Sequence, residues 1–159
     1  RTPIRNKGFG LIELLIGLTI IGTVLSAAFV ISNRSLKLRR LSTENVQAAL
    51  LLSEGAEALR LIRDSGWATT SALTLGTPYA LNWNGSMWMP ALTSPLIDDV
   101  YDRRFTLSAI RRDADHHIVT SGGTIDPDGK EVTLAVSWRT QYGATSTKST
   151  SFYLFNLFN

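Results

Sequence analysis

The sequence predicts an α+β fold in which a long N-terminal helix packs on a small antiparallel β-sheet head. Two observations predict it: an apolar run continues into an amphipathic helical pattern, and the rest of the chain alternates between short strand-like segments and turns. A chain of 159 residues suffices for one globular domain plus the helix. The expected segments are a basic N-terminal peptide (1–8), a transmembrane helix segment (9–31), an amphipathic helix of the head (32–66) and a β-rich head (67–159).

Composition and charge exclude several kinds of site. The chain has no cysteine, so disulfides, thiolate metal sites and cysteine nucleophiles are excluded. The net charge of +3 comes from Arg1, Arg5 and Lys7, because the remaining residues hold 13 basic and 13 acidic side chains. The basic end is therefore more typical of a targeting signal than of nucleic-acid binding. The first residue is Arg1 rather than Met, so the sequence does not fix the start of translation.

The run from Phe9 to Ile31 contains 23 residues and a single charged one, Glu13. As a helix it would be ~34 Å long, enough to cross a hydrocarbon layer of ~30 Å, whereas a buried helix of a soluble protein is the less favoured alternative. An acid costs about 2.5–3.5 kcal/mol at the centre of a membrane helix and less near its end. Glu13 lies one turn into the run, so it needs a positively charged partner or marks a function.

A second interpretation of this stretch is an ordinary secretory signal. Leu14 to Leu25 has the length of a signal-peptide apolar region, and Ser26-Ala27-Ala28 offers small residues at the spacing that signal peptidase requires. The mature chain would then start at Phe29. Under this alternative the protein is a secreted or membrane-anchored β-rich binding domain.

The residues around Glu13 resemble a known processing site. Gly8-Phe9-Gly10-Leu11-Ile12-Glu13-Leu14-Leu15, after the basic peptide RTPIRNKG, resembles the prepilin cleavage site of the type IV pilin superfamily. The resemblance implies that residues 1–8 are a cytoplasmic leader, that prepilin peptidase cuts after Gly8, and that Phe9 is N-methylated. It also implies that Glu13, fifth in the mature chain, helps the subunit to join a filament. The new α-amino group of Phe9 is a candidate partner for the Glu13 carboxylate, in the same or a neighbouring subunit.

The resemblance also bears on packing and on topology. Gly22 and Ser26 form a small-xxx-small pair that allows two helices to approach closely, although small residues are common in membrane helices. Pilins often carry a proline late in this helix, but none occurs here between Pro3 and Pro78, which leaves local unwinding open. Basic residues flank the apolar run on both sides, so charge alone does not orient it; those that follow it are Arg34, Lys37, Arg39 and Arg40.

A pilin-like chain implies a location and a set of partners. The precursor would cross the cytoplasmic membrane once with its N-terminus inside, and the assembled subunit would stand in an extracytoplasmic filament. Its partners would be other pilin or pseudopilin subunits, prepilin peptidase, the inner-membrane assembly platform and, before assembly, membrane lipid. No cofactor is expected, nucleic acid is not an expected ligand, and the chain is not expected to be an enzyme.

The second half of the helix shows an amphipathic stripe ending near Gly66, a suitable helix stop. The stripe consists of Leu38, Leu41, Asn45, Ala48, Leu52, Ala56, Leu59 and Ile62. Such a stripe needs a covering layer, and the predicted sheet provides one.

The head is predicted to be an antiparallel meander. Asn84-Gly85 between two apolar runs indicates a hairpin, and Val132, Leu134, Val136 and Trp138 alternate as in a half-buried strand. The predicted strands are Tyr79–Trp83, Ser86–Met89, Arg104–Ile110, His117–Thr120, Val132–Trp138 and Thr150–Phe158, with turns at Asp126–Gly129 and Gln141–Thr147. The segments SGGT, DPDGK and VTLAVSW resemble minor pilins of the modification type, and the lack of a C-terminal disulfide also favours a minor subunit or pseudopilin over a major pilin.

Three clusters of charged residues in the head are candidate sites. A polar loop is favoured over a metal site for Asp113, Asp115, His116 and His117, since adjacent histidines on a strand point to opposite faces. Asp126, Asp128 and Gly129 are better explained by a turn than by a calcium loop, because the late Glu of such a loop is missing. The pairs Arg103-Arg104 and Arg111-Arg112 could touch DNA, but a charged sheet edge exposed to solvent is favoured. No nucleophile, phosphate-loop or dinucleotide motif is present.

Overall fold

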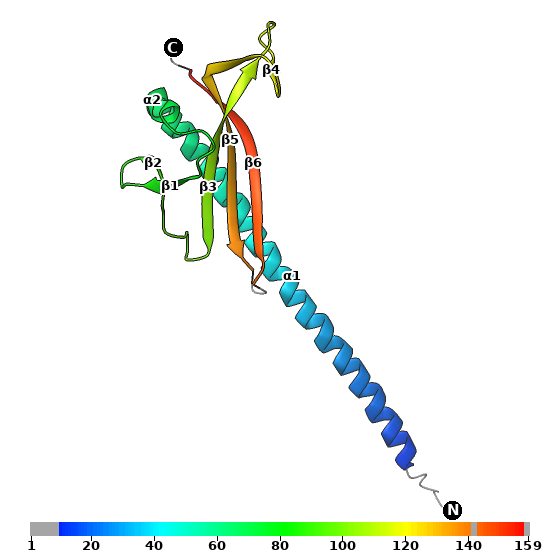
Figure 1. Ribbon diagram of the computed structural model, residues 1–159. Helices are drawn as coiled ribbons and strands as arrows, with labels where there is room; N and C mark the ends of the chain where they lie inside the picture. The colour runs from blue at the N-terminus through cyan, green and yellow to red at the C-terminus, as the bar shows by residue number, and fades with distance from the viewer. Residues whose placement is uncertain (1–9, 141–142, 158–159) are drawn as a thin grey trace, which may run out of the picture. The chain divides into compact units, whose positions relative to one another are not determined.

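The computed structural model describes residues 10–140 and 143–157 (Figure 1). The chain divides into two compact units, Arg1–Glu44 and Asn45–Asn159. The elements in chain order are α1 (Leu11–Ser65), α2 (Trp67–Ser71), β1 (Tyr79–Trp83), β2 (Trp88–Ala91), β3 (Tyr101–Arg112), β4 (Ile118–Val119), β5 (Thr124–Arg139) and β6 (Thr145–Phe155). The long predicted helix is thus confirmed, and α1 ends at Ser65, directly before Gly66.

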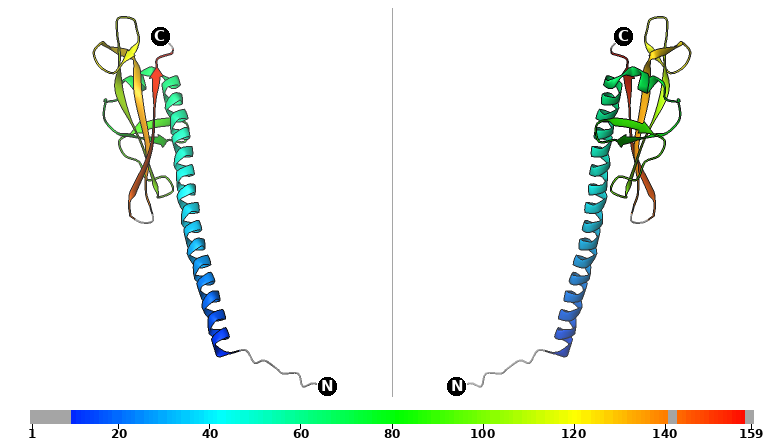
Figure 2. Two further views of the ribbon diagram at one scale, coloured as in Figure 1. Left: turned by 90° about the vertical axis from the view of Figure 1, so that its right-hand side faces the viewer. Right: turned by 90° about the vertical axis from the view of Figure 1, so that its left-hand side faces the viewer.

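The head is built on one six-stranded antiparallel sheet. Its order is β2-β1-β3-β5-β6, with the short β4 paired to the end of β3. All neighbouring strands are antiparallel, but the predicted meander is only partly correct: β1 lies between β2 and β3, and β5 pairs with β3 rather than with β4. The part of α1 that belongs to the head lies along one face of this sheet (Figure 2). The α+β architecture expected from the sequence is confirmed.

The core lies between α1 and the sheet. The helix buries Ala48, Leu52, Gly55, Ala58, Leu59 and Ile62. They pack against strand residues that include Phe105, Leu107, Val132, Leu134, Val136 and Leu154. The alternation predicted for Val132 to Trp138 is confirmed, because all four inward side chains are buried.

The predicted stripe on the helix is correct at its C-terminal end and wrong at its start. Leu38 and Asn45 are exposed, because burial on α1 begins only at Ala48. Two small residues that the stripe omitted, Gly55 and Ala58, are buried instead. A hydrophobicity pattern cannot identify them, since their contribution is close approach rather than apolar area.

Gly55 is the point of closest approach between α1 and the sheet. A Cβ atom added there would lie 2.9 Å from Leu134 Cδ2 and 3.1 Å from Arg103 Cδ. Both neighbours are held in place, because the side chain of Leu134 is fully buried and that of Arg103 is 3% exposed. A side chain at residue 55 would therefore push the helix away from β3 and β5.

The region between α1 and β3 differs from the prediction in detail. The hairpin around Asn84-Gly85 is confirmed, but β2 begins at Trp88 rather than Ser86, so the loop has four residues instead of two. Asn84 explains the longer loop, because its Oδ1 accepts hydrogen bonds from the N–H groups of Ser86 and Met87, both at 2.9 Å. The sequence also gave no indication of the short helix α2, which follows Gly66 directly.

The turn predicted at Asp126–Gly129 is wrong, since these residues lie within β5. They form a bulge: Ile110 of β3 pairs with Asp126, whereas its neighbour Ala109 pairs with Lys130. The three extra residues keep the turn-like hydrogen bond from Asp128 N–H to Asp126 Oδ1 at 2.9 Å. Pairing with β6 begins at Gly129, and the chain bends at the bulge without reversing.

Other boundaries also differ from the prediction. Strand β3 is longer than Arg104–Ile110, and the strand predicted at His117–Thr120 shrinks to Ile118–Val119. Strand β6 already starts at Thr145, so residues 145–147 are not part of a turn. The turn between β5 and β6 is closed by a hydrogen bond from Thr140 N–H to Ala144 O at 2.8 Å. Residues 141, 142 and 158 of these predictions lie outside the described residues.

We expect Gly55→Ala to lower the free energy of unfolding by about 1–2 kcal/mol. Overpacking of this kind costs about 1–3 kcal/mol, and the higher helix propensity of alanine returns up to about 1 kcal/mol. Urea unfolding of the full chain in mild detergent, followed by tryptophan fluorescence, measures the change. Ser53→Ala, on the exposed side of the same turns, is the control and should change stability by less than about 0.5 kcal/mol. A Gly55→Ala chain as stable as the wild type would contradict the close packing at this residue.

Candidate assembly helix and head surface

The first half of α1 exposes an almost unbroken apolar surface. Every described residue from Gly10 to Arg40 is exposed except Gly17, which is half-buried. The helix is long and apolar enough to cross a membrane, and no part of its most apolar window is buried. A signal sequence would meet the same criterion, so this property does not by itself separate the two interpretations.

The three hydroxyl groups between residues 10 and 31 are satisfied by the helix itself. Thr19 donates to Ile16 O, Thr23 to Ile20 O and Ser26 to Gly22 O, each at 2.8 Å. None of them therefore presents an unpaired donor to the surroundings, which suits a helix in contact with lipid or with other apolar helices.

Glu13 is the one charged residue between residues 9 and 31. It lies in the first turn of α1, where the positive end of the helix dipole favours a negative charge. Its own N–H donates to Gly10 O at 2.9 Å, but within residues 10–140 and 143–157 no hydrogen bond or ion pair of its carboxylate is found. Gly8 and Phe9, the predicted cleavage and methylation positions, lie outside the described residues, so the predicted pairing with the Phe9 amine stays a prediction.

Gly22 and Ser26 lie on one side of the helix, one turn apart. The space beside Gly22 is open, since a Cβ atom added there would have no neighbour within 4 Å. The Ser26 hydroxyl donates to the Gly22 carbonyl, so neither residue projects far from the helix. The geometry permits close approach of another helix at this point, and their role in packing stays a prediction.

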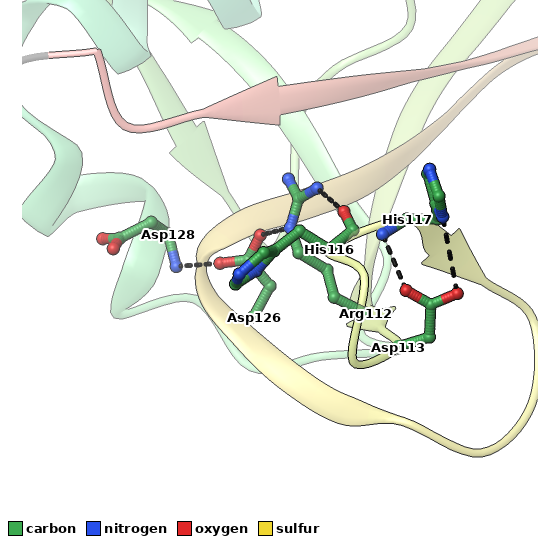
Figure 3. Close-up of polar contacts among 6 residues, drawn as sticks. All are labelled: Arg112, Asp113, His116, His117, Asp126 and Asp128. Carbon is green, nitrogen blue, oxygen red and sulfur yellow. Dashed lines mark hydrogen bonds and ion pairs between the residues drawn. The ribbon is translucent and has the colours of Figure 1, made fainter.

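Turn formation explains the acidic and histidine cluster before β4 (Figure 3). Asp113 Oδ1 accepts hydrogen bonds from the N–H groups of Asp115 at 3.0 Å and His117 at 2.8 Å. The Asp113 Oδ2 atom lies 3.7 Å from His117 Nδ1. Asp113, Asp115 and His117 could bring three ligand atoms together, but the same turn places them without an ion. Neither histidine lies on a strand, contrary to expectation, and His116 has a left-handed backbone with φ of 65°.

Arg112 and Asp126 connect this loop to the bulge of β5. Arg112 Nε donates to Asp126 Oδ2 at 2.6 Å, and its Nη1 donates to His116 O at 2.8 Å (Figure 3). The hydrogen bond from Arg112 is the main reason that the pKa of Asp126 lies below its ordinary value. The Asp128 N–H and the charges of Arg112 and Lys130 lower this pKa further, whereas partial burial opposes the shift.

The other arginine pair is also used inside the head. Arg103 is buried, and its Nη1 donates to Leu51 O at 3.1 Å and lies 3.4 Å from Glu54 Oε2. Its guanidinium stacks over Trp88 at 5.2 Å from the ring centre, beside a surface pocket of about 440 Å³. Arg104 binds Asp102 and the Leu92 carbonyl. The predicted location at a sheet edge is therefore wrong, because β3 lies inside the sheet and its arginines hold neighbouring elements together.

The comparison with protein families concerns the N-terminal segment. Residues 4–29 match the family model described as the prokaryotic N-terminal methylation motif, which is the prepilin-type signal of type IV pilins. The matched range includes the predicted cleavage position, Glu13, Gly22 and Ser26. No curated protein and no solved structure gave a significant match. The motif supports a type IV pilin-like precursor, and it indicates a structural subunit rather than an enzyme.

We expect Asp126→Asn to lower the free energy of unfolding at neutral pH by about 1–3 kcal/mol, the usual loss for a charge-assisted hydrogen bond. Because the folded-state pKa of Asp126 is depressed, the stabilisation is present above the unfolded pKa of ~3.9 and is lost as the pH falls through the lower, folded value. Urea unfolding between pH 7 and pH 2 should thus show a shallower loss below pH ~4 in the variant. Asp115→Asn, in the exposed part of the same loop, should match the wild type; equal curves for Asp126→Asn would rule out the role of the pair.

Proposed function

We propose that this chain is a minor type IV pilin-like subunit, cut after Gly8 by prepilin peptidase, methylated at Phe9 and assembled through its N-terminal helix into a pilus or pseudopilus. The observation that carries the proposal is the match of residues 4–29 to the methylation motif. The exposed apolar helix directly behind the predicted cut supports it, because such a surface needs lipid or other helices around it.

Glu13 is the residue that we assign to assembly. A carboxylate in apolar surroundings is strongly destabilised unless it is paired. Cleavage after Gly8 would create an α-amino group four residues before Glu13, close to the bilayer surface. Pairing between this amine and the Glu13 carboxylate of a neighbouring subunit would offset the cost of burying both charges and would favour one register between the two helices.

The rest of the helix would supply the contact area. The side chains from Leu11 to Ile31 are exposed in the isolated chain, and bringing helices together would exchange lipid contacts for packing between side chains. Gly22 and Ser26 would let two backbones approach closely. The subunit would leave the cytoplasmic membrane, where its N-terminus faces the cytoplasm, and enter an extracytoplasmic filament with the β-rich head outside.

The assignment to a minor subunit or pseudopilin rests on the head. The chain cannot form the C-terminal disulfide of many major pilins, because it has no cysteine. The hydrogen bond from Asn156 N–H to Asp128 O at 2.8 Å and the stacking of Arg112 on Phe155 hold this end of the chain instead. The core and these contacts thus replace a covalent constraint.

We expect Glu13→Leu to leave cleavage intact and to reduce incorporation into filaments about tenfold or more, since an α-amine without its partner in apolar surroundings costs several kcal/mol. The cut is measured by the mass of the subunit in the membrane fraction, and incorporation by immunoblotting of sheared filaments from the native host. Thr19→Leu is the matched control, because this hydroxyl is bonded within the helix and its loss should have no effect on incorporation. Normal incorporation of the Glu13→Leu chain would refute the assigned role.

A further inference from the structure

Four basic residues follow the apolar part of α1 and form what we call the basic collar: Arg34, Lys37, Arg39 and Arg40. All four are exposed. The next charged residue is Glu44 and the one after it is Glu54, so residues 32–53 have a net charge of +3. Lys37, Arg40 and Glu44 also make contacts within the chain, and these contacts leave the net positive charge unchanged.

The collar surrounds the helix rather than marking one side of it. At about 100° per residue, Arg34, Lys37 and Arg40 cover a sector of about 120°, and Arg39 lies about 160° from Lys37. A protein partner that docks on one side of a helix would need the charges on that side only. Charges around the circumference suit a partner that also surrounds the helix, as lipid does for a single membrane helix.

The collar begins within the lipid headgroup layer and extends beyond it along the helix. If Ile31 marks the edge of the hydrocarbon, Arg34 lies ~4.5 Å and Arg40 ~13.5 Å beyond it along the axis. The headgroup layer extends ~5–8 Å beyond the hydrocarbon on each side, and long basic side chains can reach back toward it. Leu36 and Leu38, exposed between the charges, give the segment the mixed apolar and basic character of an interfacial helix.

We propose that the basic collar binds the phosphate groups of anionic phospholipids in the leaflet where α1 leaves the membrane on its way to the head. The inference rests on the membrane-spanning helix of the proposed function. The proposal supplies a ligand for basic residues on the head side of the span. The usual excess of basic residues lies on the other, cytoplasmic side.

Removal of the leader changes the balance of positive charge on the two sides of the apolar run. Before the cut, Arg1, Arg5 and Lys7 balance the collar from the other side of the apolar run. Cleavage after Gly8 removes these three charges and leaves the collar as the stronger electrostatic anchor. The mature subunit is then held mainly by the leaflet that faces the head, and it must exchange these lipid contacts for subunit contacts when it enters a filament.

The test uses the absence of cysteine, which allows a single label in the full chain. Ser35→Cys places a bimane fluorophore within the collar, and the labelled chain is reconstituted in phosphatidylcholine bilayers. Quenching by phosphatidylglycerol with a nitroxide near the headgroup is compared with quenching by phosphatidylcholine labelled in the same way. We expect the anionic lipid to be favoured about threefold, and the preference to vanish in 1 M NaCl, where the Debye length is only ~3 Å.

Two variants separate the collar from other causes. Changing Arg34, Lys37, Arg39 and Arg40 together to Gln should bring the ratio to about one, whereas changing Arg1, Arg5 and Lys7 to Gln should leave it at about threefold. Inorganic phosphate should lower the preference no more than NaCl of equal ionic strength; a larger effect would indicate a site for free phosphate and overturn the lipid assignment.

A ratio of about one in the unaltered chain, or a preference that survives the collar variant, would also overturn the proposal. The first result would leave a protein partner as the occupant of the collar. The measurement needs neither cleavage nor assembly, so a mature N-terminus other than Phe9 would refute the proposed function without changing this ratio.

Discussion

The exposed apolar surface between Leu11 and Ile31 is the constraint on which the rest of this molecule depends. Moving a large aliphatic side chain out of water contributes about 1.5–3 kcal/mol, and this stretch exposes many such side chains. Its hydroxyls donate hydrogen bonds to carbonyls of the same helix, so they do not need water as a partner. Under the proposed function, a bilayer before assembly and neighbouring helices after it would cover the same surface, and Glu13, the single acid in it, would distinguish one register of the helices from another.

The head covers its apolar surface within the chain, by packing α1 on the sheet. Here the second half of α1 places small residues where the sheet comes closest, and Gly55 lets Leu134 and Arg103 lie against the helix backbone. Arg103 then reaches the Leu51 carbonyl and Glu54 across the interface. Arg103 thus stabilises the contact of helix and sheet, whereas Arg104 and Arg112 bind strand and loop residues of the head.

The parts of the fold that depend on repeating patterns could be predicted from the sequence. The period of the helix and the alternation from Val132 to Trp138 each repeat over several residues and are confirmed. The order of the strands is only partly that of a meander, because β1 lies between β2 and β3. The features that the sequence patterns do not predict depend on single contacts. Gly55 and Ala58 are buried by close approach, Asn84 lengthens the hairpin loop with two side-chain hydrogen bonds, and the bulge of β5 takes up residues 127–129 of the predicted turn. Such contacts join residues far apart in the chain or depend on one side chain, so a local pattern does not show them.

The candidate site, too, can be predicted from the sequence only in part. The spacing of Gly8, Phe9 and Glu13 was visible in the sequence, and the family match covers it. The sequence does not show the order of strands around β3, and therefore local charge alone wrongly predicts a sheet edge for its arginine pairs.

The N-terminus of the mature protein, isolated from its native host and analysed by intact mass and fragmentation, tests the central claim most directly. The account predicts a chain that begins at N-methylated Phe9. A chain that begins at Phe29 would contradict it, because signal peptidase would then have removed the assembly helix. A chain from cells with active prepilin peptidase that still carries residues 1–8 would contradict it as well, and would leave the helix as a simple membrane anchor.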